Sequence, residues 1–340
     1  MANCFIRLLY APGTVVGMVI LMLYYIKRAF LAPNGRIDMQ YTVISLLLLT
    51  LTSGVIHAQE LQVIRDVEYA KVDSISLTLD LYLPEKTSSS ALPLVVWVHG
   101  GSWRAGNKKS GEGAAELLVP AGYVVASVRY RLSQEAKFPA QIHDVKGAIR
   151  WLRTHADEYN IDAARIGAWG PSAGGHLVAL LGTSADVSKF KIGEIEMDLE
   201  GDVGGNTNVS SEVQAVCDYY GPTDFLRMND FPSDIDHDAA DSPESMLIGA
   251  TIQDHQDLTQ LANPISYISA NDPPFLIVHG TADPLVAFNQ SELLYEALLN
   301  AYNSVGKEVS FIPIEGGGHG SFKSPTLPGS VVAFFDRHLK

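Results

Sequence analysis

GPSAG, at residues 170–174, stands between two segments of opposite character. Residues 165–169 before it predict a short strand, and residues 174–182 after it predict a helix. A sharp turn between a strand and a helix exposes the central serine, and the flanking glycines let neighbouring backbone pass without a Cβ clash. The serine oxygen then lies at a helix N-terminus, where backbone N–H groups stabilise developing negative charge. Ser172 is therefore predicted to be a nucleophile.

The segments around this turn alternate between strand-like and helix-like patterns, which predicts an α/β fold with a mostly parallel sheet covered by helices. Continuous apolar runs at residues 94–98 and 123–128 indicate central strands buried on both faces. Residues 76–83 alternate between polar and apolar, which indicates a half-exposed strand near the sheet edge. Further strands are predicted at residues 213–219, 274–278 and 309–314, and helices at residues 141–159, 291–302 and 330–339.

Two stretches interrupt the alternation. Residues 186–211 are rich in Gly, Asp and Asn, and are interpreted as a loop. Residues 226–269 form a longer, acidic excursion between two strands, with short helical pieces around residues 243–248, and are interpreted as a lid-like insertion. There is no internal repeat or linker, so residues 59–340 are predicted to form one catalytic domain.

A serine needs a base to take its proton and an acid to orient that base. A G-x-S-x-G turn in this context predicts the α/β-hydrolase fold, in which the order along the chain is serine, acid, histidine. Asp283 follows the strand predicted at residues 274–278, and His319 lies in a glycine-rich loop after residues 309–314. Both therefore come at carboxyl ends of strands, where open α/β sheets place their ligands. The predicted catalytic residues are Ser172, Asp283 and His319.

Other residues compete for the roles of acid and base. Asp224 also follows a strand and could be the acid, but Asp283 is preferred, and Asp224 is interpreted as a turn-forming or helix-capping residue. His99 and His279 lie in strand-end segments, and His176 begins a helix. Each of the three is interpreted as a packed, hydrogen-bonded histidine.

HGGSW, at residues 99–103, follows a predicted central strand and matches the loop that lends a backbone N–H group to an oxyanion hole. The predicted donors are the N–H groups of Gly101, Ser102 and Ala173. Removal of one such donor costs about 2.7–4 kcal/mol of transition-state stabilisation. Trp103 is interpreted as a core residue in preference to a substrate-stacking one.

Composition excludes several other functions. The chain has 340 residues with 47% hydrophobic residues, which suits a large globular domain, and its formal charge of −14 argues against nucleic-acid binding. Cys4 and Cys217 lie too far apart in the sequence to suggest a disulfide framework. SDIDHD, at residues 233–238, lacks the spacing of a calcium loop and is interpreted as a solvated acidic loop. No cofactor and no metal are expected.

The N-terminus differs from the rest of the chain. Residues 15–26 are apolar, and a second apolar stretch at residues 43–51 resembles the core of a signal peptide with a cleavage site after Ala58. Neither run reaches the ~20 residues that cross a bilayer comfortably. We therefore expect a secreted or periplasmic protein that loses residues 1–58 and has no stable membrane partner. An uncleaved membrane anchor is the alternative, and residues 1–38 could precede the true start at Met39.

Several motifs together resemble a known family. HGGSW, VRYRLS at residues 128–133 and GPSAGGHL at residues 170–177 resemble the esterases related to hormone-sensitive lipase. GPTDF at residues 221–225 and ANPI at residues 262–265 are similar to one group among them, the bifunctional feruloyl and acetyl-xylan esterases. The resemblance covers about residue 65 to the C-terminus. Pro171 departs from the pattern and should stiffen the turn without changing the chemistry of the serine.

The resemblance implies hydrolysis of carboxylic esters, with acetyl or feruloyl groups on plant polysaccharide as substrates. It also implies that residues 226–269 cover the acyl pocket. Kynurenine formamidases share the H-G-G-x-W motif, so an amidase or peptidase of the same fold remains an alternative. A non-catalytic binding protein is a third hypothesis, which the presence of all three predicted catalytic residues argues against.

Overall fold

The computed structural model describes residues 61–85, 90–320 and 322–340. These residues belong to one compact unit, Gln59–Lys340. The predicted signal segment at residues 1–58 lies outside the described residues. No helix within the described ranges combines the length and apolar character that a membrane crossing requires.

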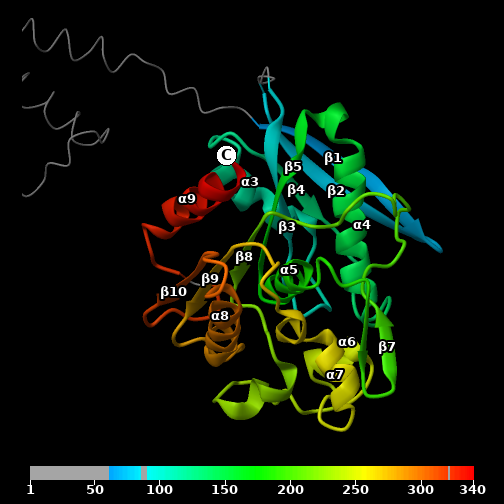
Figure 1. Ribbon diagram of the computed structural model, residues 1–340, viewed down its shortest axis with the longest axis vertical. Helices are drawn as coiled ribbons and strands as arrows, with labels where there is room; N and C mark the ends of the chain where they lie inside the picture. The colour runs from blue at the N-terminus through cyan, green and yellow to red at the C-terminus, as the bar shows by residue number, and fades with distance from the viewer. Residues whose placement is uncertain (1–60, 86–89, 321) are drawn as a thin grey trace, which may run out of the picture. The chain divides into compact units, whose positions relative to one another are not determined.

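An eight-stranded sheet forms the centre of the molecule, in the order β1-β2-β4-β3-β5-β8-β9-β10. β2 pairs antiparallel with β1 and β4, and every other pairing in this sheet is parallel. This is the mostly parallel sheet that the sequence predicts (Figure 1). The strands are β1 (Leu61–Val72), β2 (Ile75–Pro84), β3 (Leu92–Val98), β4 (Val124–Val128), β5 (Ile161–Pro171), β8 (Ala215–Tyr219), β9 (Phe275–Gly280) and β10 (Val309–Ile314).

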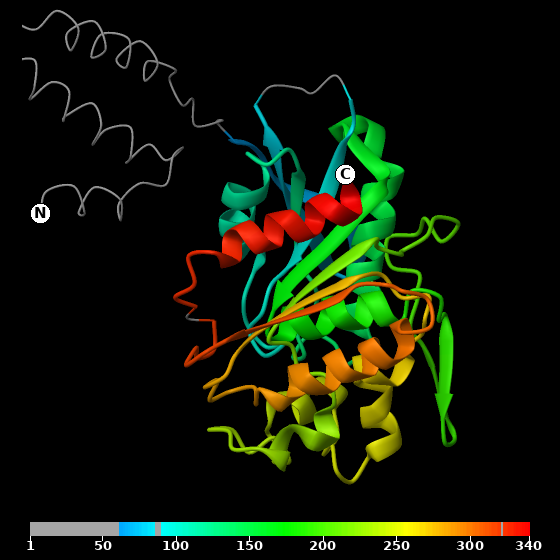
Figure 2. The same cartoon turned by 60° about the vertical axis from the view of Figure 1, so that its left-hand side comes forward.

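Helices cover both faces of this sheet. Figure 2 shows α9, in red, lying across one face, and Figure 1 shows α5 over the middle of the sheet and α4 nearer to β1. The α-helices of the main fold are α3 (Glu112–Leu118), α4 (Ala140–Thr154), α5 (Ala173–Thr183), α8 (Asn289–Tyr302) and α9 (Leu327–Leu339), with short 3₁₀ turns η2 (Lys108–Gly111) and η3 (Ala156–Tyr159).

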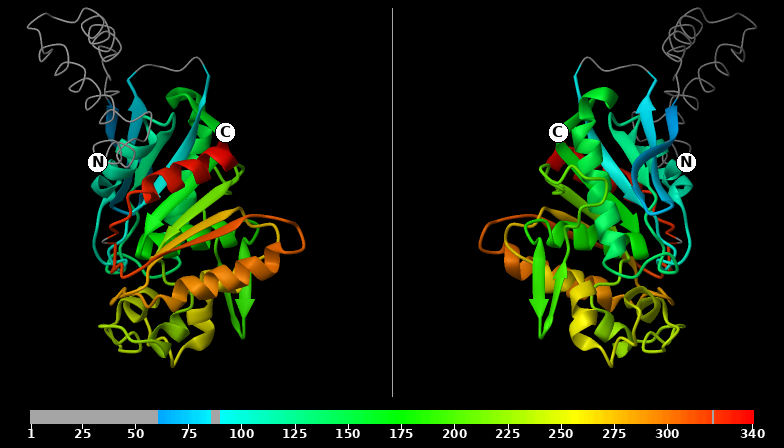
Figure 3. Two further views of the ribbon diagram at one scale, coloured as in Figure 1. Left: turned by 90° about the vertical axis from the view of Figure 1, so that its left-hand side faces the viewer. Right: turned by 90° about the vertical axis from the view of Figure 1, so that its right-hand side faces the viewer.

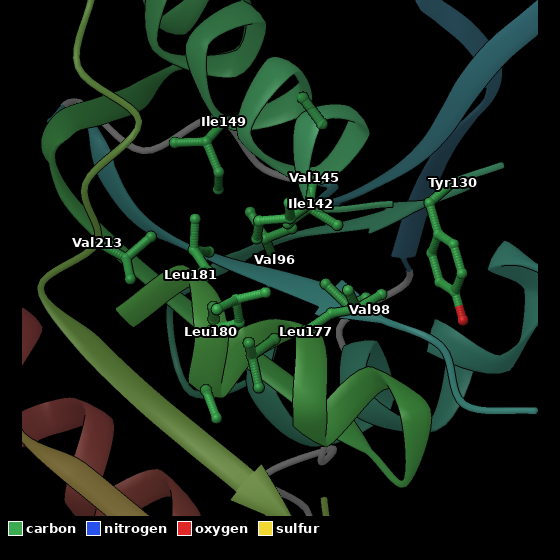
Figure 4. Packing of buried hydrophobic residues seen from close by; sticks show 14 of the residues in the cluster. Val96, Val98, Tyr130, Ile142, Val145, Ile149, Leu177, Leu180, Leu181 and Val213 are labelled. Carbon is green, nitrogen blue, oxygen red and sulfur yellow. The ribbon is translucent and has the colours of Figure 1, made fainter. Parts of the chain in front are cut away.

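The core consists of two layers, one on each face of the sheet. Along β3, Val96 and Val98 point into the layer under α4, α5 and α8, whereas Val95 points into the layer under α3 and α9. Figure 4 shows the first layer, in which Leu177 of α5 packs near Val98. A strand buried on both faces needs apolar residues at every position, which is why β3 is a continuous apolar run.

The structure adds one strand that was not predicted and corrects two predictions about secondary structure. β1 was not predicted; it is an edge strand with many exposed side chains and two register shifts. β2 is more buried than expected, because β1 and β4 flank it and its Asp80 is fully buried. Residues 186–211 are not only a loop: β6 (Lys189–Ile192) and β7 (Ile195–Asp198) form a hairpin outside the main sheet (Figure 3).

The predicted insertion between β8 and β9 is confirmed as an excursion built from short helical pieces. They are η4 (Phe225–Asp230), α6 (Pro243–Ile248), α7 (Gln256–Ala262) and η5 (Pro264–Tyr267). Ser242 caps α6 by accepting a hydrogen bond from the N–H group of Ser245, and Pro243 begins the helix. β6 packs against α7, so the hairpin supports the insertion from the side.

Candidate active site

Ser172 lies at the turn between β5 and α5, in a backbone conformation that few residues adopt. Its φ is 55° and its ψ is −123°, and its N–H group donates to the carbonyl of Tyr219 on β8 at 2.8 Å. A Cβ atom at Gly170 would lie 2.7 Å from the carbonyl oxygen of Val98, and one at Gly174 would lie 2.0 Å from the same oxygen. Both glycines are therefore required for the close packing of this turn against β3.

The structure brings the three predicted catalytic side chains into one chain of contacts. His319 Nε2 lies 3.1 Å from Ser172 Oγ, and His319 Nδ1 lies 2.7 Å from Asp283 Oδ2. The second carboxylate oxygen of Asp283 accepts hydrogen bonds from the N–H groups of Leu285 and Val286, at 2.9 and 3.0 Å. Asp283 is therefore fixed in position, and it orients the imidazole whose other nitrogen faces the serine.

Burial alone raises the pKa of Asp283, but hydrogen bonds from His279 and His319 outweigh it and hold that pKa well below its usual range. The carboxyl side chain is fully buried, whereas the imidazole of His319 is 20% exposed. The site therefore contains a fixed negative charge beside a partly accessible base. Such a pair can accept the proton of the serine and stabilise the resulting imidazolium.

The loop after β3 has the unusual backbone that an oxyanion hole needs. Gly101 has a φ of 115°, and Ser102 follows with a φ of 55°. Within the described part of the chain, the N–H groups of Gly101, Ser102 and Ala173 make no hydrogen bond. Ser102 and Ala173 line the cavity over the serine, whereas Gly101 does not. Ser102 and Ala173 are thus better placed to donate than Gly101.

The competing acid and bases have other roles in the structure. Asp224 caps η4 by accepting from the N–H group of Leu226. His99 stacks on Tyr130, and burial lowers the pKa of His99 to about 4. His279 supports Asp283, with its Nε2 at 3.3 Å from the carboxylate and its Nδ1 at 2.7 Å from Ser291 Oγ.

His176 and Trp103 form a buried support behind the oxyanion loop. Trp103 Nε1 donates to His176 Nδ1 at 3.2 Å, and His176 Nε2 donates to the carbonyl of Ala262 at 2.8 Å. This pattern requires the neutral imidazole, and burial lowers its pKa to about 4. Trp103 is 1% exposed and belongs to the core, although one part of it borders the cavity.

A narrow cavity of about 30 Å³ lies over Ser172 and His319. Most of its wall is apolar. The apolar residues are Trp103, Ala173, Pro222, Ile235, Pro243, Leu285 and Val286. A cavity of this size has room for about two water molecules, so it fits a small group in the conformation described.

Three further residues at this site were not predicted from the sequence. Tyr220 packs edge-on against the imidazole of His319, with ring centres 4.6 Å apart. His237 and Glu244 line the cavity and are almost fully buried, although His237 lies in the stretch interpreted as a solvated loop. That interpretation was wrong for His237, because this residue is 1% exposed and its Nε2 lies 3.1 Å from the carbonyl oxygen of Leu285. No signal in the local sequence distinguishes these residues, since their burial depends on distant segments.

Among the described residues, no group of three or more His, Cys, Asp or Glu side chains could hold a metal ion. Two of the sequence motifs shared with the feruloyl and acetyl-xylan esterases, GPTDF at residues 221–225 and ANPI at residues 262–265, contact each other. Asn263 of the ANPI motif accepts from the N–H group of Phe225 at 3.0 Å and donates to Asp224 at 2.8 Å. These motifs therefore fix the start of the insertion.

The eight-stranded sheet and the sharp turn at Ser172 define a protein of the α/β-hydrolase fold. A family model described as BD-FAE matches residues 79–298, so the chain belongs to that family. The predicted relationship to the hormone-sensitive-lipase-like esterases is thereby confirmed.

The chain is similar to a curated protein named Esterase LipC from Mycobacterium tuberculosis, with 30% identity over 73% of this chain and 58% of the relative. It spans about half the length of the curated relatives it matches. Among solved structures, a bifunctional GH43-CE protein of Bacteroides eggerthii is 39% identical, with a TM-score of 0.74 over 82% of this chain and 38% of that one. A truncated carbohydrate esterase from gut microbiota is 34% identical, with a TM-score of 0.73 over 83% of this chain and 98% of that one.

Proposed function

We propose that this chain is a serine esterase that removes short acyl groups, acetyl above all, from hydroxyl groups of plant polysaccharide. The observation that carries the proposal is the chain of contacts from Ser172 Oγ through His319 to Asp283, at 3.1 and 2.7 Å. Similarity to proteins named carbohydrate esterase supports the class of substrate. The narrow cavity supports a short acyl group in preference to a feruloyl group.

The proposed reaction has two steps. Ser172 Oγ attacks the ester carbonyl while His319 Nε2 takes the proton of the hydroxyl, and the oxyanion forms beside the N–H groups of Ser102 and Ala173. The tetrahedral intermediate then expels the alcohol, which takes the proton from His319. In the second step water attacks the acyl-enzyme and His319 takes the proton of the water. His319 then returns this proton to Ser172 Oγ as the carboxylic acid leaves.

A panel of initial rates tests the proposal. The substrates are acetylated xylo-oligosaccharide, nitrophenyl acetate and butyrate, methyl ferulate, and N-formylkynurenine. We expect the highest kcat/KM on the acetyl esters and a loss of activity in Ser172→Ala. Dominant turnover of methyl ferulate would shift the proposal to aromatic acyl groups, and dominant turnover of N-formylkynurenine would replace it with an amidase.

We also propose that the protein is exported and loses residues 1–58. The apolar stretch at residues 43–51 and the small residue Ala58 support this proposal. N-terminal sequencing of the protein from fractionated cells tests it. A mature N-terminus at Gln59 in the secreted or periplasmic fraction is expected, whereas an intact chain in the membrane fraction would favour the anchor.

A further inference from the structure

The insertion places a buried acid–histidine pair in the wall of the cavity, and the proposed reaction gives this pair no role. His237 and Glu244 line the same cavity as Ser172 and His319. Their side chains are 1% and 3% exposed, and His237 Nδ1 lies 2.9 Å from Glu244 Oε2. Burying a charged pair is costly, so a pair retained beside the reacting groups calls for a functional explanation.

The surroundings of His237 require that both of its ring nitrogens donate. Nδ1 faces the carboxylate of Glu244, and Nε2 lies 3.1 Å from the carbonyl oxygen of Leu285. Ser233 Oγ also approaches Nε2, at 3.2 Å, but its proton has the carbonyls of Pro284 and Leu285 as acceptors. Burial alone lowers the pKa of His237, but the hydrogen bond and the charge of Glu244 raise it overall. His237 is therefore assigned as an imidazolium that donates to Glu244 from Nδ1 and to the carbonyl of Leu285 from Nε2.

One oxygen of Glu244 remains available. Oε2 is held by His237, whereas Oε1 has no hydrogen-bond partner within the described ranges of the chain. Oε1 is not among the fully buried polar atoms that lack a partner, so a donor on a small ligand can reach it. Apart from the reacting groups and the pair itself, the cavity wall is mainly apolar. Glu244 Oε1 is therefore a hydrogen-bond acceptor in a mainly apolar wall, and it favours a ligand that carries a hydrogen-bond donor.

We propose that Glu244, positioned by His237, determines specificity by accepting a hydrogen bond from a substrate hydroxyl adjacent to the scissile ester. The inference rests on the proposed esterase function and names its substrate class more closely. Because the cavity is narrow, the hydroxyl must lie near the ester, as a vicinal hydroxyl of a sugar or another polyol does. The preferred substrate is therefore an acyl group on an alcohol that carries a free neighbouring hydroxyl.

Two acetates that differ by one hydroxyl test the inference: trans-2-hydroxycyclohexyl acetate and cyclohexyl acetate. The measured quantity is the ratio of their kcat/KM values with the full chain. We expect a ratio of at least about ten for the wild type, since a hydrogen bond to a charged group carries that much discrimination. Glu244→Gln should lower the ratio several-fold, because the neutral amide is a weaker acceptor and no longer forms an ion pair with His237.

Asp241→Asn is the matched control. Asp241 is an exposed acid three positions before Glu244, so the variant changes the charge of the same segment away from the cavity. Its ratio should equal that of the wild type. If Glu244→Gln does not fold, Glu244→Asp keeps the charge but withdraws the carboxylate by one methylene, and it should lower the ratio as well.

A wild-type ratio near one overturns the inference whatever the variants do, and so does an unchanged ratio in a folded Glu244→Gln variant. These results leave the proposed esterase function in place, because both acetates are still hydrolysed. If the wild type hydrolyses neither acetate and no ester of the panel, the proposed function and the inference are both overturned.

Discussion

Two regions of the site hold their side chains in different ways. One consists of the strand ends that carry Ser172, Asp283 and His319, and the other is the insertion at residues 226–269. At the strand ends the backbone itself holds the side chain: Ser172 is held by a strained turn and a hydrogen bond to β8. In the insertion, side chains hold one another, as His237 holds Glu244. The difference teaches that the proposed chemistry depends on backbone turns, whereas the proposed selectivity depends on contacts between side chains of the insertion.

Two buried histidines show the same contrast in their protonation. His176, beneath the turn, accepts from Trp103 and donates to the carbonyl of Ala262, so it is neutral. His237, in the insertion, faces a carboxylate and a carbonyl, so it is charged. The neighbouring donors and acceptors decide the charge of each histidine, and acid and base should therefore affect the two regions in opposite ways.

The largest expected effect comes from the acid at the strand end. Asp283→Asn should lower kcat on nitrophenyl acetate by about 10⁴-fold, because the amide no longer selects the imidazole tautomer that faces Ser172. Initial rates measure this effect. Asp224→Asn is the control, since Asp224 follows the neighbouring strand β8 but caps η4. A comparable loss in Asp224→Asn would mean that the acid has been assigned to the wrong residue.

A smaller loss is expected from the oxyanion loop. In Gly101→Ala the added Cβ would lie 2.4 Å from the carbonyl oxygen of Ala105, at a φ of 115° that alanine rarely adopts. The loop should shift and move the N–H group of Ser102, and kcat should fall by about 10²–10³-fold. Gly205→Ala, also at positive φ but in open space, controls for backbone strain. Equal kcat values for the two variants would contradict the predicted role of the loop.

Low pH should reduce the stability that the neutral His176 contributes beneath the Ser172 turn. The unfolded chain binds a proton at His176 near pH 6.5, whereas the folded protein does so only near pH 4. The unfolded state therefore takes up this proton first as the pH falls, and the contribution of His176 to the free energy of unfolding should decrease by a few kcal/mol between these values. His99 contributes in the same direction. Burial raises the pKa of Asp218 and of Asp272 to about 7, so these groups act with the opposite sign, equally in the wild type and in a His176 variant.

Urea unfolding at pH 7 and at pH 4.5 measures this loss. His176→Gln should lose less stability than the wild type between the two conditions, although it starts from a lower value. Asp283, whose pKa is lowered, adds to the loss only below about pH 4, so it does not affect the comparison. An identical loss in the wild type and the variant would contradict the neutral state assigned to His176.

The smallest effect is expected in the insertion, with the opposite sign. The pKa of His237 is raised, so its stabilising contribution is complete below about pH 6.5 and is lost as the pH rises through the raised value. Hydrogen exchange of residues 233–248 should therefore accelerate several-fold at alkaline pH relative to the exchange of α5. In His237→Asn this relative acceleration should disappear. Its persistence in the variant would assign it to another group.

The strand ends could be predicted from the sequence because each is a short pattern with a local cause. The helix predicted at residues 174–182 is α5 (Ala173–Thr183), and residues 309–314 are β10. Glycines on both sides of Ser172 are required by contacts within this turn and with β3, so the motif alone indicates the geometry. The contact between His319 and Asp283 followed from their positions after parallel strands.

Other features could not be predicted, because their cause lies elsewhere in the fold. β1 is an edge strand with exposed charges and register shifts, so it lacks a regular apolar alternation. In the part of the chain that the structure describes, β6 and β7 form a separate two-stranded sheet that packs on α7. Strands outside the central sheet need no continuous apolar run. His237 stands among acidic residues that suggest solvent exposure, and its burial depends on Leu285, 48 positions away.

Covalent labelling by a fluorophosphonate tests the central claim, that Ser172 is the nucleophile of an esterase, most directly. The full chain is incubated with the probe, its intact mass is measured, and the modified peptide is identified. We expect one adduct per chain, on Ser172, with loss of ester hydrolysis in step with labelling and neither labelling nor hydrolysis in Ser172→Ala. An adduct on another serine, or hydrolysis retained in Ser172→Ala, would contradict the account.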